Sequence, residues 1–104
     1  MTRVIFDSGG LSLSMEGHAG CGKSGQDIVC AAESMLLYTL VDWLRCREAL
    51  MHPDIYMAAG QARIVCRPEK GQQRRCREML SAFYRGYELL GERYPQAVRT
   101  EKRQ

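Results

Sequence analysis

The chain has 104 residues, of which 45% are hydrophobic and 26% are charged, and its formal net charge is +3. This length suits a single domain over residues 1–104, and the composition excludes fibrous and intrinsically disordered proteins. No run reaches the roughly 18 apolar residues that cross a bilayer, and the N-terminal segment has no signal-peptide core, so we expect a cytoplasmic protein and no membrane partner.

The first predicted elements are two strands. Residues 3–6 are rich in β-forming side chains, and residues 11–16 alternate apolar and polar side chains as a half-buried strand does. Ser8, Gly9 and Gly10 supply a turn between them. The sequence therefore predicts a β-hairpin, and the four glycines from Gly17 to Gly25 predict a loop after it.

A long helix is predicted from Asp27 to about Met51. Asp27 is a suitable N-cap, because its carboxylate can accept the unpaired amide protons of the first turn. The helix is apolar around most of its circumference, and one small sheet cannot cover such a helix alone. We therefore expect it to be central, with part of its surface in a homodimer interface.

The second half of the chain repeats the order of hairpin and helix. Residues 54–58 and 62–66 flank a glycine turn, and another helix is predicted from about Gln72 until Pro95. Residues 97–99 suit a short edge strand. The order ββαββα(β) predicts an α+β fold in which two helices pack on a mostly antiparallel sheet. The apolar stripe of the second helix consists of Cys76, Leu80, Phe83, Tyr87, Leu90 and Tyr94.

Five cysteines and an uneven charge need an explanation. An odd number of cysteines without an export signal argues against a disulfide framework. Cys46, Cys66 and Cys76 fall on predicted apolar faces, where a free cysteine packs as a small hydrophobe. Residues 53–104 hold eleven basic and six acidic side chains, which is typical of a solvated helix face. We expect no direct RNA binding, because no aromatic–basic motif accompanies this charge.

Cys30 and His18 are the candidate catalytic residues. Cys30 lies in the first turn of the predicted helix, where unpaired amide protons and the helix dipole favour a thiolate over a thiol. His18 ends the second strand, and the glycine-rich loop lets its imidazole approach the sulfur as a base. A cysteine at this position is also often only packed, so residue chemistry alone leaves a structural role open.

A longer pattern surrounds both residues. It comprises Gly17-His18-Ala19, a glycine-rich loop, and Gly25-x-Asp27-Ile28-Val29-Cys30-Ala31-Ala32-x-Ser34, with twelve residues from His18 to Cys30. This pattern closely resembles the ribosomal-processing cysteine protease family called Prp, and the family's order of elements fits the whole chain. Two positions depart from the family: Cys21 lies in the loop, and Glu33 replaces a residue that is usually small or apolar.

The resemblance implies a cysteine endopeptidase that removes the N-terminal extension of a large-subunit ribosomal protein during ribosome maturation. It implies cleavage after bulky apolar or aromatic residues by a homodimer, with Cys30 as nucleophile and His18 as acid and base. Amides of the first turn, including that of Cys30, are expected to stabilise the oxyanion. Gly17, Asp27 and Ser34 would support the pair, Asp27 mainly as helix cap and Ser34 by shaping the pocket. The expected substrate loop consists of Gly20, Cys21, Gly22, Lys23, Ser24 and Gly25.

Three alternatives are weaker. Residues 17–24 formally match the phosphate-binding loop G-x-x-x-x-G-K-S, but the helix starts too late and no parallel sheet is predicted, so we expect no nucleotide. His18, Cys21 and Cys30 could approach a zinc ion, but no Cys-x-x-Cys pair accompanies them, so we expect no metal and no cofactor. The third is a non-catalytic module that associates with the ribosome or RNA through the basic second half.

Overall fold

The structure is a computed structural model, and it describes residues 1–18 and 27–104. In the described part, strands and helices follow one another in the order β1, β2, α1, α2, β3, β4, α3 and β5. Their bounds are Thr2–Asp7, Ser12–Glu16, Ile28–Arg45, Glu48–Met51, Pro53–Ala58, Gln61–Cys66, Gln73–Arg93 and Val98–Arg103.

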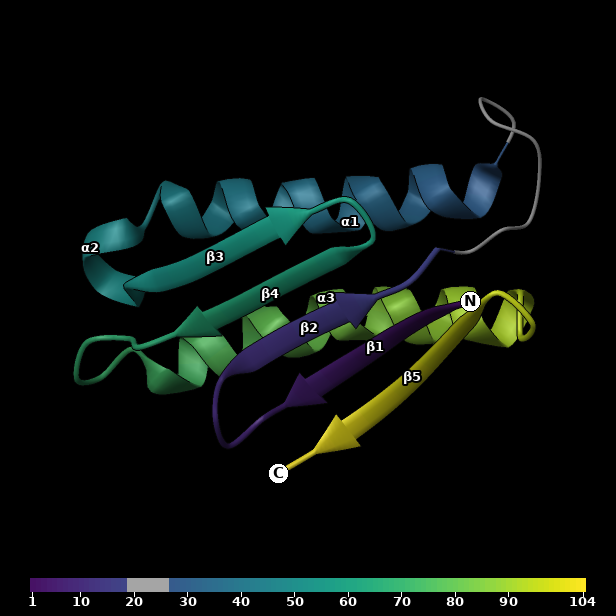
Figure 1. The fold of residues 1–104 in the computed structure, drawn as a ribbon. Coiled ribbons are helices and arrows are strands. Elements are labelled where there is room, and N and C mark those ends of the chain that lie inside the picture. Colours follow the sequence, from purple (N-terminus) through teal and green to yellow (C-terminus); the bar gives the residue numbers. More distant parts are fainter. Residues whose placement is uncertain (19–26) are drawn as a thin grey trace.

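The five strands form one sheet in the order β3-β4-β2-β1-β5 (Figure 1). Neighbouring strands are antiparallel, except that β5 runs parallel to β1. Alternation along the central strand β2 turns one face of it to the core, because Leu13 and Met15 are buried while Ser12 and Ser14 are only partly covered. The predicted α+β fold and mostly antiparallel sheet are confirmed.

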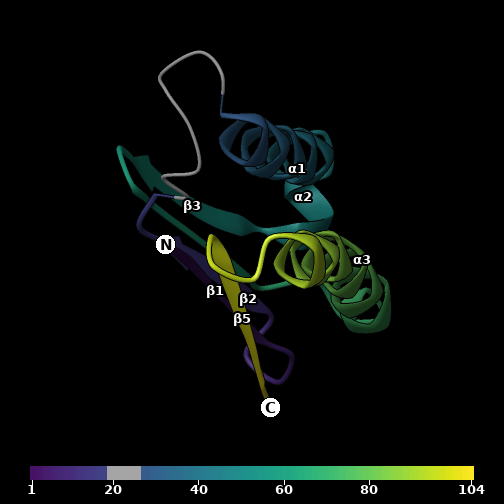
Figure 2. The same cartoon turned by 90° about the vertical axis from the view of Figure 1, so that its right-hand side faces the viewer.

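Helices α1 and α3 lie side by side on one face of the sheet, and the opposite face carries no helix of the described residues (Figure 2). Between these two layers lies one hydrophobic core. Helix α3 contributes the predicted stripe with one addition, because Tyr84 is buried as well, whereas Phe83, Leu90 and Tyr94 are only partly buried.

Helix α1 is shorter and less buried than the sequence predicts. It ends at Arg45, and the one-turn helix α2 follows only after Cys46 and Arg47. The expectation of a central helix is wrong, because α1 covers the sheet beside α3 and leaves much of its surface exposed. Cys46 is also exposed, contrary to expectation, whereas Cys66 and Cys76 are buried. The buried residues of α1 are Val29, Leu40, Val41 and Leu44.

Strand β5 lies at the sheet edge, as predicted, but it is longer than residues 97–99. It extends to Arg103 and pairs with β1 over its whole length. The amide of Thr2 donates to the carbonyl of Ala97 at 2.8 Å and aligns the two strands. Because most of its side chains are charged, this strand lacks the alternating apolar residues from which a strand is predicted.

The only tryptophan of the sequence, Trp43, lies near the C-terminal end of α1. The guanidinium carbons of Arg47 and Arg75 lie 4.3 and 5.5 Å from the centroid of its ring. The contact from Arg75 connects α1 with α3, and the contact from Arg47 connects the end of α1 with the start of α2.

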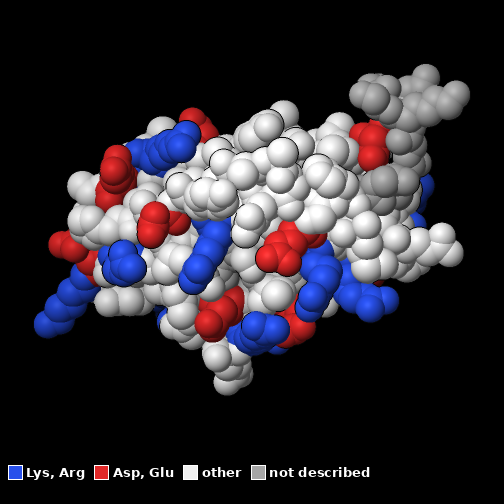
Figure 3. Space-filling view, viewed as in Figure 1, with Lys and Arg blue, Asp and Glu red and all other residues white. Residues whose placement is uncertain are grey.

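Basic and acidic side chains are interspersed over the face of the molecule shown in Figure 3. On α3, Arg74 pairs with Glu78 at 3.1 Å and Arg85 pairs with Glu92 at 2.8 Å. These exposed pairs suit a solvated helix face. In the described ranges, no helix is long and apolar enough to cross a membrane.

Candidate active site

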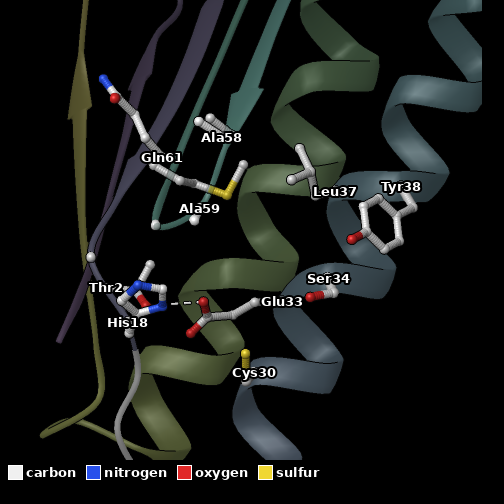
Figure 4. A pocket seen from close by; sticks show the side chains of 14 residues that line it. Thr2, His18, Cys30, Glu33, Ser34, Leu37, Tyr38, Ala58, Ala59 and Gln61 are labelled. Atoms are coloured by element: carbon white, nitrogen blue, oxygen red, sulfur yellow. Dashed lines mark hydrogen bonds between the residues drawn. The ribbon is translucent and has the colours of Figure 1, made fainter.

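One pocket of about 260 Å³ contains both candidate catalytic residues (Figure 4). The start of α1 contributes Cys30, Glu33 and Ser34, and the end of β2 contributes Gly17 and His18. The remaining walls come from Thr2 of β1, Met15 of β2, Leu37 and Tyr38 of α1, and residues 58–62 around the β3–β4 turn.

Cys30 lies in the first turn of α1 and is exposed. Asp27 is the N-cap of the helix, and its Oδ1 accepts a hydrogen bond from the amide of Cys30 at 3.0 Å. The sulfur is therefore presented at the positive end of the helix dipole. Because the Cys30 amide already has an acceptor, it is not free to stabilise an oxyanion, contrary to the sequence-based expectation.

His18 lies two residues after the last residue of β2 and is exposed. The amide of Gly17 donates to the carbonyl of Gly60 at 2.8 Å, which attaches the end of β2 to the β3–β4 turn. The His18 ring lies over Gly60, since a Cβ added there would come within 2.7 Å of Nε2. Gly60 also has a φ of 71°, a conformation that favours glycine. The second hairpin thus helps to place the histidine.

Glu33 projects into the same pocket. Its Oε2 accepts a hydrogen bond from the Thr2 hydroxyl at 2.9 Å, and its backbone carbonyl accepts one from the Tyr87 hydroxyl at 3.1 Å. Burial raises the pKa of the Glu33 carboxyl, and the hydrogen bond from Thr2 opposes this effect. In the sequence, Glu33 is only a departure from the family pattern, whereas in the structure it lines the same pocket as both candidates.

Of the other predicted site residues, some lie in the pocket and others lie outside the described residues. Ser34 lines the pocket one turn after Cys30. The expected substrate loop, residues 20–25, lies outside the described residues, and so do parts of the zinc and phosphate-loop alternatives. Thr2, Tyr38 and Gly60 were missed, because they come from distant segments and carry no local motif.

Comparison with known proteins decides the family. The model of the family described as cysteine protease Prp matches residues 1–99. The chain belongs to the Prp cysteine protease family. It is therefore a protease of the cysteine type.

Solved structures share the Prp fold. The ribosomal processing protease Prp from S. aureus, with a covalently linked product peptide, has a TM-score of 0.84 at 24% identity, over 99% of this chain and 100% of that chain. The S. aureus Prp with a substrate peptide has a TM-score of 0.76 at 23% identity, over 99% and 100%. SMU.848 from Streptococcus mutans has a TM-score of 0.69 at 26% identity, over 98% and 91%. No curated protein matches the chain.

Proposed function

We propose that this Prp-family protease removes the N-terminal extension of a large-subunit ribosomal protein, with Cys30 as nucleophile and His18 as acid–base partner. The observation that carries the proposal is that both side chains line one open pocket, the sulfur from the first turn of α1 and the imidazole from the end of β2. The similar S. aureus protein is a ribosomal processing protease that takes a peptide substrate. Residues 1–104 would act as one cytoplasmic domain.

The chemistry requires two proton transfers. His18 accepts the proton of the Cys30 thiol, and the sulfur attacks the scissile carbonyl to form a tetrahedral intermediate. His18 then protonates the leaving amine, and water hydrolyses the thioester. Asp27 supports this sequence by fixing the backbone of Cys30 through its hydrogen bond to the amide.

The walls of the pocket favour an apolar substrate side chain. Met15, Leu37 and Ala62 supply apolar surface, and Tyr38 adds an aromatic ring. A bulky apolar or aromatic residue before the scissile bond would exclude water from this surface. The composition of the walls therefore supports cleavage after such a residue.

Incubation with the precursor of the host's own ribosomal protein tests the proposal. We expect one cut, located by mass spectrometry after a bulky apolar or aromatic residue. A precursor with aspartate at that position is the control and should stay intact. Binding of the precursor or of ribosomal RNA without any cleavage would instead favour the non-catalytic alternative.

We further propose that the protease is a homodimer whose interface includes the exposed face of α1. Ile28 and Met35, seven residues apart on this helix, are 72% and 64% exposed. A second apolar depression lies between α1 and α3, and Met35, Leu36 and Phe83 are among the residues that line it. A second copy of the chain would remove this apolar surface from water.

Light scattering checks the dimer. We expect twice the chain mass of 11.8 kDa for the wild type and a monomer for Met35→Glu, because the new charge would be buried at the interface. Leu50→Glu, at an exposed position of α2, is the matched control and should remain dimeric. A monomeric wild type at micromolar concentration would contradict the proposal.

A further inference from the structure

The carboxyl group of Glu33 has one oxygen that the structure leaves unpaired. Its Oε1 is buried and has no hydrogen-bond partner among the described residues, whereas Oε2 accepts from the Thr2 hydroxyl at 2.9 Å. A buried polar atom without a partner costs free energy, and such atoms in native proteins often have a functional reason. In the proposed reaction of Cys30 and His18, this oxygen has no assigned role.

The position of Glu33 relates it to both catalytic candidates. It follows Cys30 by three residues on α1, and residues with this spacing share a helix face. In Figure 4, its side chain extends from α1 toward His18. Burial raises the pKa of Glu33, while the hydrogen bond from Thr2 and the charge of His18 lower it. The carboxyl group is thus desolvated and sensitive to the charge on the imidazole.

Other ionisable groups face the same space. Asp27 raises the pKa of Glu33, and the α-amino group of Met1 lowers it. The hydroxyl of Tyr87 donates to the backbone carbonyl of Glu33, and one carboxylate oxygen of Asp27 accepts from the Cys30 amide. Tyr38 lines the wall farther along α1. Among the described residues of this pocket, Glu33 Oε1 is the buried acceptor that remains free.

We propose that Glu33 is a positioning residue for His18, and that its Oε1 accepts the N–H of one ring nitrogen while the other nitrogen exchanges a proton with Cys30. This role rests on the proposed function. In the structure the ring lies over Gly60, so a rotation of the side chain must bring it toward Oε1. The thiol proton moves from Cys30 to His18, and the ionised Glu33 accepts a hydrogen bond but no proton. Its negative charge stabilises the imidazolium that forms.

Glu33→Gln tests this role, because it keeps the size of the side chain and an acceptor for Thr2 but removes the charge. We expect kcat for precursor cleavage at neutral pH to fall roughly tenfold or more, with KM changed less than about twofold. In the wild type, kcat should fall as pH decreases through the raised pKa of Glu33, because protonation removes the charge. That acidic limb should be absent from the Glu33→Gln profile.

Thr2→Val provides a second, directional measurement. It removes the hydrogen bond that favours the ionised carboxylate, so the pKa of Glu33 should rise further and the acidic limb of kcat should move to higher pH. Glu48→Gln, on exposed α2, is the matched control and should keep the wild-type profile.

Thermal unfolding separates this role from a structural one. Because the pKa of Glu33 is raised, the folded state holds its proton more tightly than the unfolded chain, and stability decreases as pH rises through that window. Glu33→Gln should therefore unfold at pH 7 no earlier than the wild type. A purely structural glutamate would instead give a lower unfolding temperature together with the lower kcat, which would overturn the inference.

Cys30→Ala separates the positioning role of Glu33 from the protease activity on which it rests. If the wild type cleaves, Cys30→Ala does not, and Glu33→Gln keeps the wild-type kcat and pH profile, the positioning role is wrong while the protease assignment stands. Cleavage by Cys30→Ala would overturn the proposed function itself.

Discussion

Replacement of Cys30 by alanine is expected to abolish cleavage of the ribosomal precursor, with a loss of at least about 10⁴-fold in kcat. None of the other three described cysteines can replace it, because Cys46 lies at the far end of α1 and Cys66 and Cys76 are buried. The fold should survive, since the backbone amide of Cys30, not its sulfur, bonds to Asp27. The measurement is cleavage by purified variant with circular dichroism as a check on folding.

Cys46→Ala is the matched control, because Cys46 is the other exposed thiol of the described residues. It should cleave at the wild-type rate. Iodoacetamide near neutral pH should label Cys30 well before Cys46, since only Cys30 lies at a helix N-terminus. Equal labelling of the two thiols, or residual turnover by Cys30→Ala, would show that Cys30 is not the nucleophile.

Gly17→Ala is expected to destabilise the fold by about 2 kcal/mol and to lower the unfolding temperature by roughly 10 °C. Gly17 has a φ of 95°, which is unfavourable for a residue with a Cβ, and the added Cβ would overlap the backbone carbonyl oxygen of Met1. The rate of precursor cleavage should also fall at temperatures where the variant is still folded, because any shift of Gly17 also displaces His18. Differential scanning calorimetry gives the first effect, and cleavage assays below the unfolding temperature give the second.

Gly71→Ala separates the two causes. Gly71 has a similar φ of 90°, but an added Cβ would meet nothing within 4 Å. Its replacement should therefore cost only the backbone strain, about 1 kcal/mol. If Gly17→Ala were no more destabilising than Gly71→Ala, the overlap with the Met1 carbonyl would have no measurable cost.

The sequence predicts secondary structure best where an element is marked by a local signal of a few residues. Both hairpins and the cap at Asp27 could be predicted, because turn glycines, alternation and a capping carboxylate act over a few residues. The end of α1 at Arg45 was missed, since neither glycine nor proline marks the break. Strand β5 was underestimated because Glu101, Lys102 and Arg103 are charged, and their pairing with β1 depends on a partner at the other end of the chain.

The residues of the candidate site likewise comprise some that a local pattern predicts and others that only the fold brings together. His18, Asp27 and Cys30 belong to one contiguous pattern, so a family resemblance could locate them. Thr2 and Gly60 enter the pocket only because sheet order places β1 and the β3–β4 turn beside the end of β2. Glu33 looked like a simple departure until its hydrogen bond to Thr2 and its unpaired oxygen were visible. Long-range proximity of this kind leaves no signature in neighbouring residues.

The environment of Trp43 makes this protein convenient for optical measurements. The indole is the sole tryptophan, and the guanidinium groups of Arg47 and Arg75 contact it near the end of α1 opposite to Cys30. Because the ring contacts Arg75 of α3, its fluorescence is expected to report whether α1 remains docked on α3. Denaturation curves of variants that keep Trp43 can therefore be recorded without an added label, by exciting the indole selectively over the five tyrosines.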